Sequence, residues 1–292
     1  MARTQSFRIL VASDGSRVAK AAVRTALQFP WPSPSSASGV TAKFVRGDVR
    51  LSIVLAALDR TAEGVAADTA RILAARWPDA DALVLEGGAA DVIVSEARRR
   101  HADVIVMGWR GQGAVRRLLT GSVSRAVVRQ APCPVLVTRK AVKAVNTIVI
   151  GIDGSSHSLA AFDLVGRLPS KGRRIILLSA IDTMSLPSQI HLTASMRTTI
   201  AAEVRRINGR RRADAEKSLQ QMKSELSRRG WKVTILVTNG APLHALLSQI
   251  AKSRADLLVV GARGATGLDR VLLGSVANGA LNRSPVPVLI VR

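Results

Sequence analysis

The sequence predicts an α/β protein of two tandem domains, each an open five-stranded parallel sheet with helices on both faces, packed together as a pseudo-dimer. Three observations predict this class. Short apolar runs alternate with amphipathic stretches along the chain. The second half repeats the first. Aromatic residues make up 3% of the 292 residues and tyrosine is absent, so the core must consist of Ala, Val, Leu and Ile, which suits parallel sheets buried under helices.

The internal repeat sets the domain organisation. Residues 101–139 align with residues 254–292 without a gap, and RILVASDGS near the N-terminus aligns with TIVIGIDGS starting at Thr147. The second copy therefore begins where the first ends. We predict one domain over residues 1–140 and a second over residues 141–292, with the boundary in the short stretch Lys140–Asn146.

The apolar runs predict five strands in each copy. In the first copy they are ILVAS (9–13), LSIVLAALD (51–59), ALVLEG (82–87), DVIVMG (103–108) and PVLVTR (134–139). In the second copy they are IVIGI (148–152), RIILLSAID (174–182), KVTILV (232–237), DLLVVG (256–261) and PVLIVR (287–292). Helical patterns lie between them, at 16–27, 92–101 and 195–229. The Pro/Ser-rich segment Trp31–Gly39 predicts a surface loop, and residues 183–197 predict an excursion before the long helix.

One glycine motif recurs at the end of the fourth strand of each copy. Its spacing is G-x2-G-x9-G-S, formed by Gly108, Gly111, Gly121 and Ser122 and again by Gly261, Gly264, Gly274 and Ser275. Ligands of open parallel sheets bind beyond the carboxyl ends of the strands. Glycines there let the backbone approach a phosphate, and a Gly-Ser before a helix offers free N–H groups to an anion. Tight turns are the alternative explanation.

These motifs, together with Asp14 in ASDGS and Asp153 in GIDGS, resemble the universal stress protein family in its tandem form and ATP-binding branch. The resemblance implies an adenine nucleotide alpha hydrolase-like, or Rossmann-like, fold and a cytoplasmic stress-response protein that binds ATP, with or without Mg²⁺. It also implies that the last strands of the two copies pair across a pseudo-two-fold axis. The implied phosphate and ribose contacts are Gly108, Arg110, Gly111, Gly121, Ser122, Val123 and Ser124 in the first copy, and Gly261, Arg263, Gly264, Gly274, Ser275 and Val276 in the second. The implied nucleoside positions are Ser13, Asp14 and Ala57, and Ile152, Asp153 and Ala180.

Several of these positions have a second interpretation. Either aspartate can act as a turn former or helix N-cap, and Arg110 and Arg263 can be solvated surface side chains instead of phosphate ligands. The copies also differ, because Ser124 in the first corresponds to Ala277 in the second. A hydroxyl near a helix N-terminus predicts that the first site binds phosphate at least as tightly as the second.

A formal net charge of +23 and a pI near 11.7 indicate either a polyanionic partner or a general Arg-rich composition. Arginine runs at 98–100 and 205–212 form either a solvated helix face, which is the favoured interpretation, or a surface that faces phosphates. A nucleic-acid-binding or anionic-surface docking protein is therefore the alternative function. No signature of sequence-specific nucleic-acid recognition is present. An unknown protein partner is expected, and a homodimer stays open.

No motif for catalysis is present in the sequence. It lacks the Walker phosphate loop, the dinucleotide G-x-G-x-x-G spacing and any His or Cys pattern with metal-ligand spacing. The single cysteine excludes an internal disulfide, and no apolar run reaches membrane-spanning length. We therefore predict a cytoplasmic nucleotide sensor or regulator with little or no hydrolysis and no membrane insertion.

Overall fold

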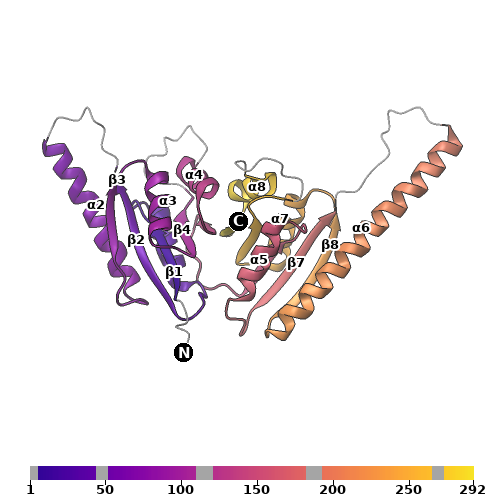
Figure 1. The fold of residues 1–292 in the computed structure, drawn as a ribbon, viewed down its shortest axis with the longest axis horizontal. Coiled ribbons are helices and arrows are strands. Elements are labelled where there is room, and N and C mark those ends of the chain that lie inside the picture. Colours follow the sequence, from indigo (N-terminus) through magenta and orange to yellow (C-terminus); the bar gives the residue numbers. More distant parts are fainter. Residues whose placement is uncertain (1–5, 44–51, 110–120, 182–192, 265–272) are drawn as a thin grey trace.

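The computed structural model describes residues 6–43, 52–109, 121–181, 193–264 and 273–292 (Figure 1). The strands are β1 (Phe7–Ala12), β2 (Ser35–Lys43), β3 (Ala82–Glu86), β4 (Val104–Gly108), β5 (Val135–Thr138), β6 (Thr147–Gly151), β7 (Arg174–Ile181), β8 (Lys232–Asn239), β9 (Leu257–Gly261) and β10 (Val288–Val291). The helices are α1 (Arg17–Gln28), α2 (Ser52–Leu73), α3 (Ala89–Arg99), α4 (Ser122–Gln130), α5 (Ser156–Gly166), α6 (Ala194–Arg228), α7 (Pro242–Ser253) and α8 (Ser275–Arg283).

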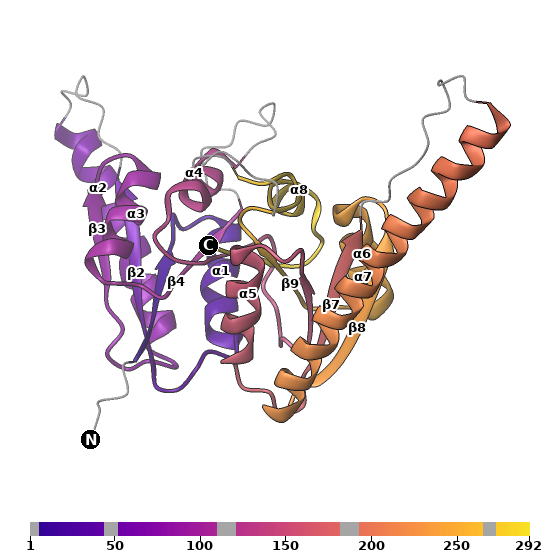
Figure 2. The same ribbon diagram turned by 45° about the vertical axis from the view of Figure 1, so that its right-hand side comes forward.

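The strands form one continuous ten-stranded sheet in the order β3-β2-β1-β4-β5-β10-β9-β6-β7-β8. Each half is parallel, and the halves join where β5 and β10 pair antiparallel. The register of that pair is Val135↔Ile290, Leu136↔Leu289 and Val137↔Val288. Figure 1 and Figure 2 show the two halves on either side of this seam. The predicted pairing of the last strands, and with it the pseudo-dimer, is confirmed.

Two arginines cross the seam in reciprocal directions. Arg139, directly after β5, donates from Nη2 to the carbonyl oxygens of Leu281 at 2.6 Å and Asn282 at 2.7 Å, at the end of α8. Arg292, directly after β10, donates from Nη1 to the carbonyl oxygens of two residues at the end of α4, at 2.7 and 3.1 Å. Each guanidinium thus caps a helix C-terminus of the opposite half, where a positive charge is also favoured by the helix dipole.

The sheet is covered on both faces. One apolar core contains residues of α1, α2, α5 and α6 with one face of the strands, and the other contains residues of α3, α4, α7 and α8 with the opposite face. Because each strand of a parallel sheet is buried on both sides, its sequence is a continuous apolar run. This explains why four of the five strands of the first copy are recognisable from the sequence.

The second strand of the first copy was predicted in the wrong place. Residues 52–59 begin helix α2 and do not form a strand, whereas β2 occupies Ser35–Lys43, partly inside the predicted surface loop Trp31–Gly39. A short apolar run without alternation fits a buried strand or a buried helix equally well. The Leu and Ala residues of this run have strong helix propensity, and helix is the state that the fold selects.

Close packing explains the small, polar composition of β2. A Cβ on Gly39 would lie 2.7 Å from Cβ of Ala82 on β3 and 2.9 Å from Cγ2 of Thr69 on α2. Ser38 and Thr41 are buried on the same strand. The strand therefore requires small side chains where its neighbours approach, and a hydropathy pattern cannot detect that requirement.

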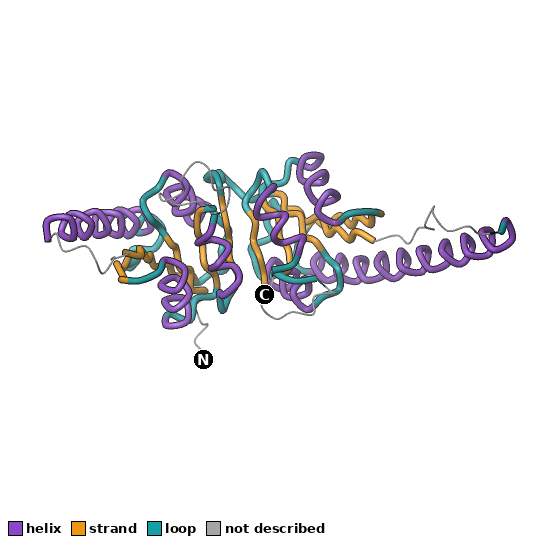
Figure 3. Tube along the Cα trace, turned by 90° about the horizontal axis from the view of Figure 1, so that it is seen from above, coloured by secondary structure: helices purple, strands orange, loops and turns teal. Residues whose placement is uncertain are grey.

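Helix α6 is the longest element, with 35 residues, or about 52 Å at 1.5 Å per residue. Its last third packs through Leu219, Met222 and Leu226, and the rest extends beyond the sheet (Figure 1, Figure 3). Part of the predicted excursion at 183–197 is helical, since α6 begins at Ala194 behind the N-cap Thr193. Among the helices described, none is both long and apolar enough to cross a membrane.

Candidate functional site

An Asp-Gly-Ser turn follows the first strand of each half. Oδ1 of Asp14 accepts a hydrogen bond from the backbone N–H of Ser16 at 3.0 Å, and Oδ1 of Asp153 accepts one from Ser155 at the same distance. The glycine between them has a left-handed φ of +75° in the first copy and +79° in the second. One carboxylate oxygen of each aspartate therefore shapes the turn, as the turn-former interpretation predicts.

In the second copy this turn is joined to the glycine loop after β9. Oγ of Ser155 donates to the carbonyl oxygen of Arg263 at 3.2 Å. A Cβ on Gly264 would lie 2.8 Å from Oδ2 of Asp153. The predicted nucleoside residue and the predicted phosphate loop are thus neighbours at the carboxyl edge of the sheet.

The first glycine of each motif has a packing role. A Cβ on Gly108 would lie 3.0 Å from the backbone carbon of Val18 in α1, and one on Gly261 would lie 2.9 Å from the backbone nitrogen of Ser158 in α5. These glycines allow a helix to start directly against the end of a strand. We attributed these glycines, from the sequence, to the approach of a phosphate. The close contact with the helix explains their presence without a ligand.

The second half of each motif forms a helix N-terminus. Gly121 is the N-cap of α4 and Gly274 the N-cap of α8, and neither helix has a side-chain hydrogen bond at its cap. The next residues lie at the surface: Ser122, Val123 and Ser275 are exposed, and Val276 is half-buried. The first-turn N–H groups of both helices have no capping side chain, which is the arrangement that binds anions.

Ser124 has a different role from the one expected. Its side chain is 1% exposed, and its hydroxyl lies 2.8 Å from the carbonyl oxygen of Trp109 and 3.1 Å from that of Gly121. In the second copy, where Ala277 replaces Ser124, the carbonyl oxygen of Ala262 corresponds to that of Trp109. It accepts a hydrogen bond from the backbone N–H of Gly274 at 2.8 Å. The hydroxyl therefore closes the loop internally. That it distinguishes the two sites by contacting phosphate stays a prediction, and these two internal hydrogen bonds argue against it.

Replacing Ser124 by alanine should accordingly affect stability more than ligand binding. Loss of the hydroxyl removes a hydrogen bond to a buried carbonyl, which we expect to lower the free energy of unfolding by about 1 to 2 kcal/mol. Urea denaturation measures this change, and ATP titration under native conditions is the control. A tenfold loss of ATP affinity without a loss of stability would restore the phosphate-contact interpretation.

Positive groups gather at the second copy. His157, on the first turn of α5, has its pKa lowered by burial and by the neighbouring Arg263. The pKa of Arg292 is also lowered, by burial and again by Arg263. His157 is therefore neutral at pH 7, and the two half-buried guanidiniums repel each other across this edge. Arg292 was not among the site residues predicted from the sequence. A signal was available, because each copy of the repeated last strand ends in arginine, at Arg139 and at Arg292.

The first copy has a cavity of about 490 Å³ beside its Asp-Gly-Ser turn. Its described lining includes Ser13 and Gly15 from the turn, Lys20 from α1 and a stretch of α2 containing Arg60 and Asp68. The volume is in the range of small-molecule sites. The lining residues of α1 and α2 include Val23, which belongs to the core that also contains residues of α5 and α6.

Ser13 and Ile152 are the first residues after β1 and β6, and both are buried. Their backbone N–H groups donate to Val40 at 3.0 Å and to Leu178 at 2.8 Å in the neighbouring strands. Because the two hydrogen bonds are equivalent, Val40 in β2 corresponds to Leu178 in β7. Other residues of these two strands can be matched by counting from this pair.

The nucleoside position in the second strand needs correction in the first copy. Ala180 lies near the end of β7, two residues beyond the carbonyl acceptor in that strand. Counting in the same way along β2 gives Ala42, whereas Ala57 lies in α2. The error follows from the misplaced strand. Arg110 and Gly111, predicted as phosphate contacts, lie outside the described residues.

Where the chain is described, no group of three or more His, Cys, Asp or Glu side chains could hold a metal ion. Cys133 is buried, and burial raises the pKa of its thiol to about 12. A thiol with this pKa is not a nucleophile at neutral pH.

The fold defines a tandem α/β protein in which an Asp-Gly-Ser turn and an uncapped helix N-terminus recur in each half. The sequence model described as the universal stress protein family matches residues 6–139 and 144–292. The chain belongs to the universal stress protein family, with two such domains in tandem.

Curated relatives carry the same family name. A universal stress protein of Mycobacterium tuberculosis is 32% identical over 208 residues, which cover 66% of this chain and 62% of that protein. One from Bacillus subtilis is 28% identical over 153 residues, covering 50% of this chain and 99% of that protein. The chain thus spans less than two thirds of the mycobacterial relative.

Solved structures show the same fold. A universal stress protein from Archaeoglobus fulgidus has a TM-score of 0.67 at 18% identity, covering 99% of both chains. A crystal structure described as a putative universal stress protein from Pseudomonas aeruginosa has a TM-score of 0.57 at 16% identity, covering 98% of this chain and 93% of that one. At such low identity the likeness concerns the fold alone.

Proposed function

We propose that the protein binds ATP at the carboxyl edge of each half and serves the stress response in the cytoplasm as a nucleotide sensor or regulator. The observation that carries this proposal is the pair of uncapped helix N-termini at Gly121 and Gly274, each following a glycine motif of identical spacing. Backbone N–H groups at a helix N-terminus bind phosphate, and the helix dipole adds to the attraction.

The second copy offers further support at the phosphate end. Arg263 lies in the loop that joins β9 to α8, His157 lies beside Arg263, and both side chains carry nitrogen donors suited to an anion. Asp153 lies beside Gly264, so a nucleoside held at the turn would direct its phosphates toward α8. In the first copy, the cavity beside Ser13 and Gly15 provides room next to the equivalent turn.

We infer a binding role with little or no hydrolysis because Asp14 and Asp153, the carboxylates common to both edges, each use one oxygen to accept a backbone hydrogen bond within their own turn. His157 is the only titratable candidate in the described part of the second edge besides Asp153, and its counterpart in the first copy is Val18. Any Mg²⁺ would be held mainly by the phosphates, because no group of three protein ligands gathers among the residues described. Mass spectrometry of the small molecules released on denaturation tests the ligand, and an adenine nucleotide is expected.

The pKa of His157 provides a pH test of the second site. Because this pKa is lowered, His157 of the ligand-free protein loses its proton at a lower pH than an ordinary histidine does. Bound phosphates would favour the protonated imidazole, so ATP affinity should gain an added contribution as pH falls from 8 to 6. We expect wild-type affinity to exceed that of His157→Asn increasingly over this range, by about threefold to tenfold at pH 6.

The measurement is calorimetry of both proteins at several pH values, since titration of ATP itself affects both alike. The first site, which has valine at this position, provides an internal control. An affinity ratio that stays constant with pH would contradict a phosphate contact at His157.

A further inference from the structure

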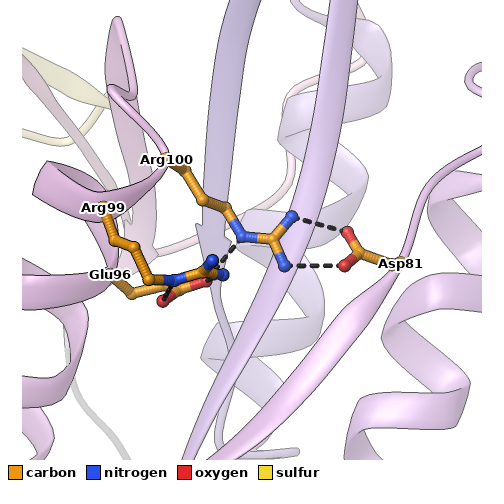
Figure 4. A network of polar contacts seen from close by, with 4 residues as sticks. All are labelled: Asp81, Glu96, Arg99 and Arg100. Atoms are coloured by element: carbon orange, nitrogen blue, oxygen red, sulfur yellow. Dashed lines mark hydrogen bonds and ion pairs between the residues drawn. The ribbon is translucent and has the colours of Figure 1, made fainter.

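The two arginine runs of the sequence have different surroundings. At the end of α3, Arg99 and Arg100 both bind the carboxylate of Glu96, which is only 3% exposed, and Arg100 also forms two parallel hydrogen bonds to Asp81 at 2.8 and 2.6 Å. Figure 4 shows this network. The charges of these two arginines are neutralised within the first half, so they do not form a surface for a polyanion.

The second run lies on the outer half of α6, residues 195–214. None of these residues is buried, and among the described elements none lies beside this segment where it extends beyond the sheet (Figure 1, Figure 3). At 1.5 Å per residue it is about 30 Å long. In proteins most of the stability of a helix comes from tertiary packing, and none of the residues of this segment is buried. A binding partner would therefore stabilise it.

The outer half of α6 is strongly basic. It contains six arginines and two acidic residues. Arg206 pairs with Glu203 at 2.5 Å. For Arg197, Arg205 and Arg210, the described part of the structure contains no ion-pair partner. A second copy of this basic segment would be repelled by the first. The positive charge therefore favours a polyanion as the binding partner.

The distribution of side chains disfavours a membrane surface. At about 100° per residue, the four large apolar side chains of this segment define an arc of only about 80°; they are Met196, Ile200, Val204 and Ile207. Arg211 falls inside that arc. An interfacial helix requires a wide, uninterrupted apolar face, and this helix lacks one.

The positions of the arginines favour a groove with phosphates on both sides. Arg205 and Arg210 are separated by about 140° around the helix, so they point to opposite flanks. A flat acidic surface would meet only one flank. The major groove of B-form DNA, about 12 Å wide, admits a helix of 10–12 Å diameter and has a phosphate row on each side. Small side chains keep this helix slim: Ser195, Thr198, Thr199, Ala201, Ala202, Gly209 and Ala213.

We propose that the outer half of α6 binds the major groove of duplex DNA through the phosphate backbone, without sequence specificity. Arg197, Arg205 and Arg210 contact phosphates on the two flanks of the groove. This binding is separate from the nucleotide sites, which lie at the carboxyl edges of the sheet.

The test is fluorescence anisotropy with a labelled random-sequence DNA duplex of two helical turns, over a series of salt concentrations. The triple variant Arg197→Gln, Arg205→Gln, Arg210→Gln should bind at least tenfold more weakly than the wild type. The slope of log K against log salt should become shallower by about 3, because each phosphate contact contributes about 0.9.

The matched control replaces three exposed arginines elsewhere, Arg24, Arg167 and Arg228, by glutamine, and thereby makes the same change in net charge. It should bind within about threefold of the wild type. Circular dichroism and ATP titration show that both variants are folded. Equal losses in the two triple variants would overturn the proposal, as would tighter binding of the wild type to anionic phospholipid vesicles or to polyglutamate than to DNA at the same salt.

Discussion

Replacing both Arg139 and Arg292 by methionine is expected to lower the free energy of unfolding by about 3 to 6 kcal/mol. Each guanidinium donates to two carbonyl oxygens at the C-terminus of a helix in the opposite half. Hydrogen bonds that involve a charged group contribute about 1.5 to 3 kcal/mol each in net terms, and we count one such contribution per arginine. Methionine keeps most of the apolar stem but removes the donors.

Urea denaturation of the double variant measures this effect. The control pair, Arg24→Met and Arg167→Met, removes the same charge from exposed positions and should change stability by less than about 1 kcal/mol. The corresponding lysine pair should recover only part of the loss, because an ammonium group does not reproduce the planar fork of arginine. A double variant as stable as its control would show that the seam is held by the β5–β10 pair and its apolar neighbours alone.

Replacing Gly274 by valine is expected to weaken ATP binding at the second site by about a hundredfold. A Cβ there would lie 3.3 Å from the carbonyl oxygen of Ala262 and from Cα of Arg263, so the fold can tolerate the change with small shifts. The added methyl groups would stand at the N-terminus of α8 and block its N–H groups. Loss of one or two hydrogen bonds to a charged phosphate accounts for that factor.

Gly121→Val is the equivalent change in the first copy, with an added structural consequence. A Cβ at Gly121 would lie 2.1 Å from the carbonyl oxygen of Trp109, so the loop before α4 must move. We therefore expect lower stability as well as lost ATP binding at that site. Gly209→Val on α6, where a Cβ meets nothing within 4 Å, is the control for a valine in place of glycine.

The fold was largely predictable because parallel strands buried on both faces have distinctive sequences, such as DVIVMG and PVLIVR. The repeat of PVLVTR as PVLIVR, together with the family resemblance, predicted the seam. The second strand was missed because its small residues are selected by the approach of Ala82 and Thr69, which is a property of the packed structure. A continuous apolar run at the start of α2 was more conspicuous than this weak strand.

The candidate site was predicted in part. The sequence located the glycine motifs and the aspartate turns because both depend on local backbone geometry. The role of Ser124 depends on which carbonyl its hydroxyl meets in the folded loop, and the position equivalent to Ala180 depends on strand register. Arg292 contributes to the second edge only because β10 lies next to β9. Such contacts between distant segments have no signature in local sequence.

The most direct test of the central claim is calorimetric titration of the wild type, Gly121→Val, Gly274→Val and the double variant with ATP. If each half carries one nucleotide site, the wild type should bind two equivalents of ATP per chain, each single variant one, and the double variant none. Circular dichroism of each protein verifies its fold. Unchanged ATP binding in a folded double variant would contradict the assignment of the Gly-Ser helix N-termini as the phosphate sites.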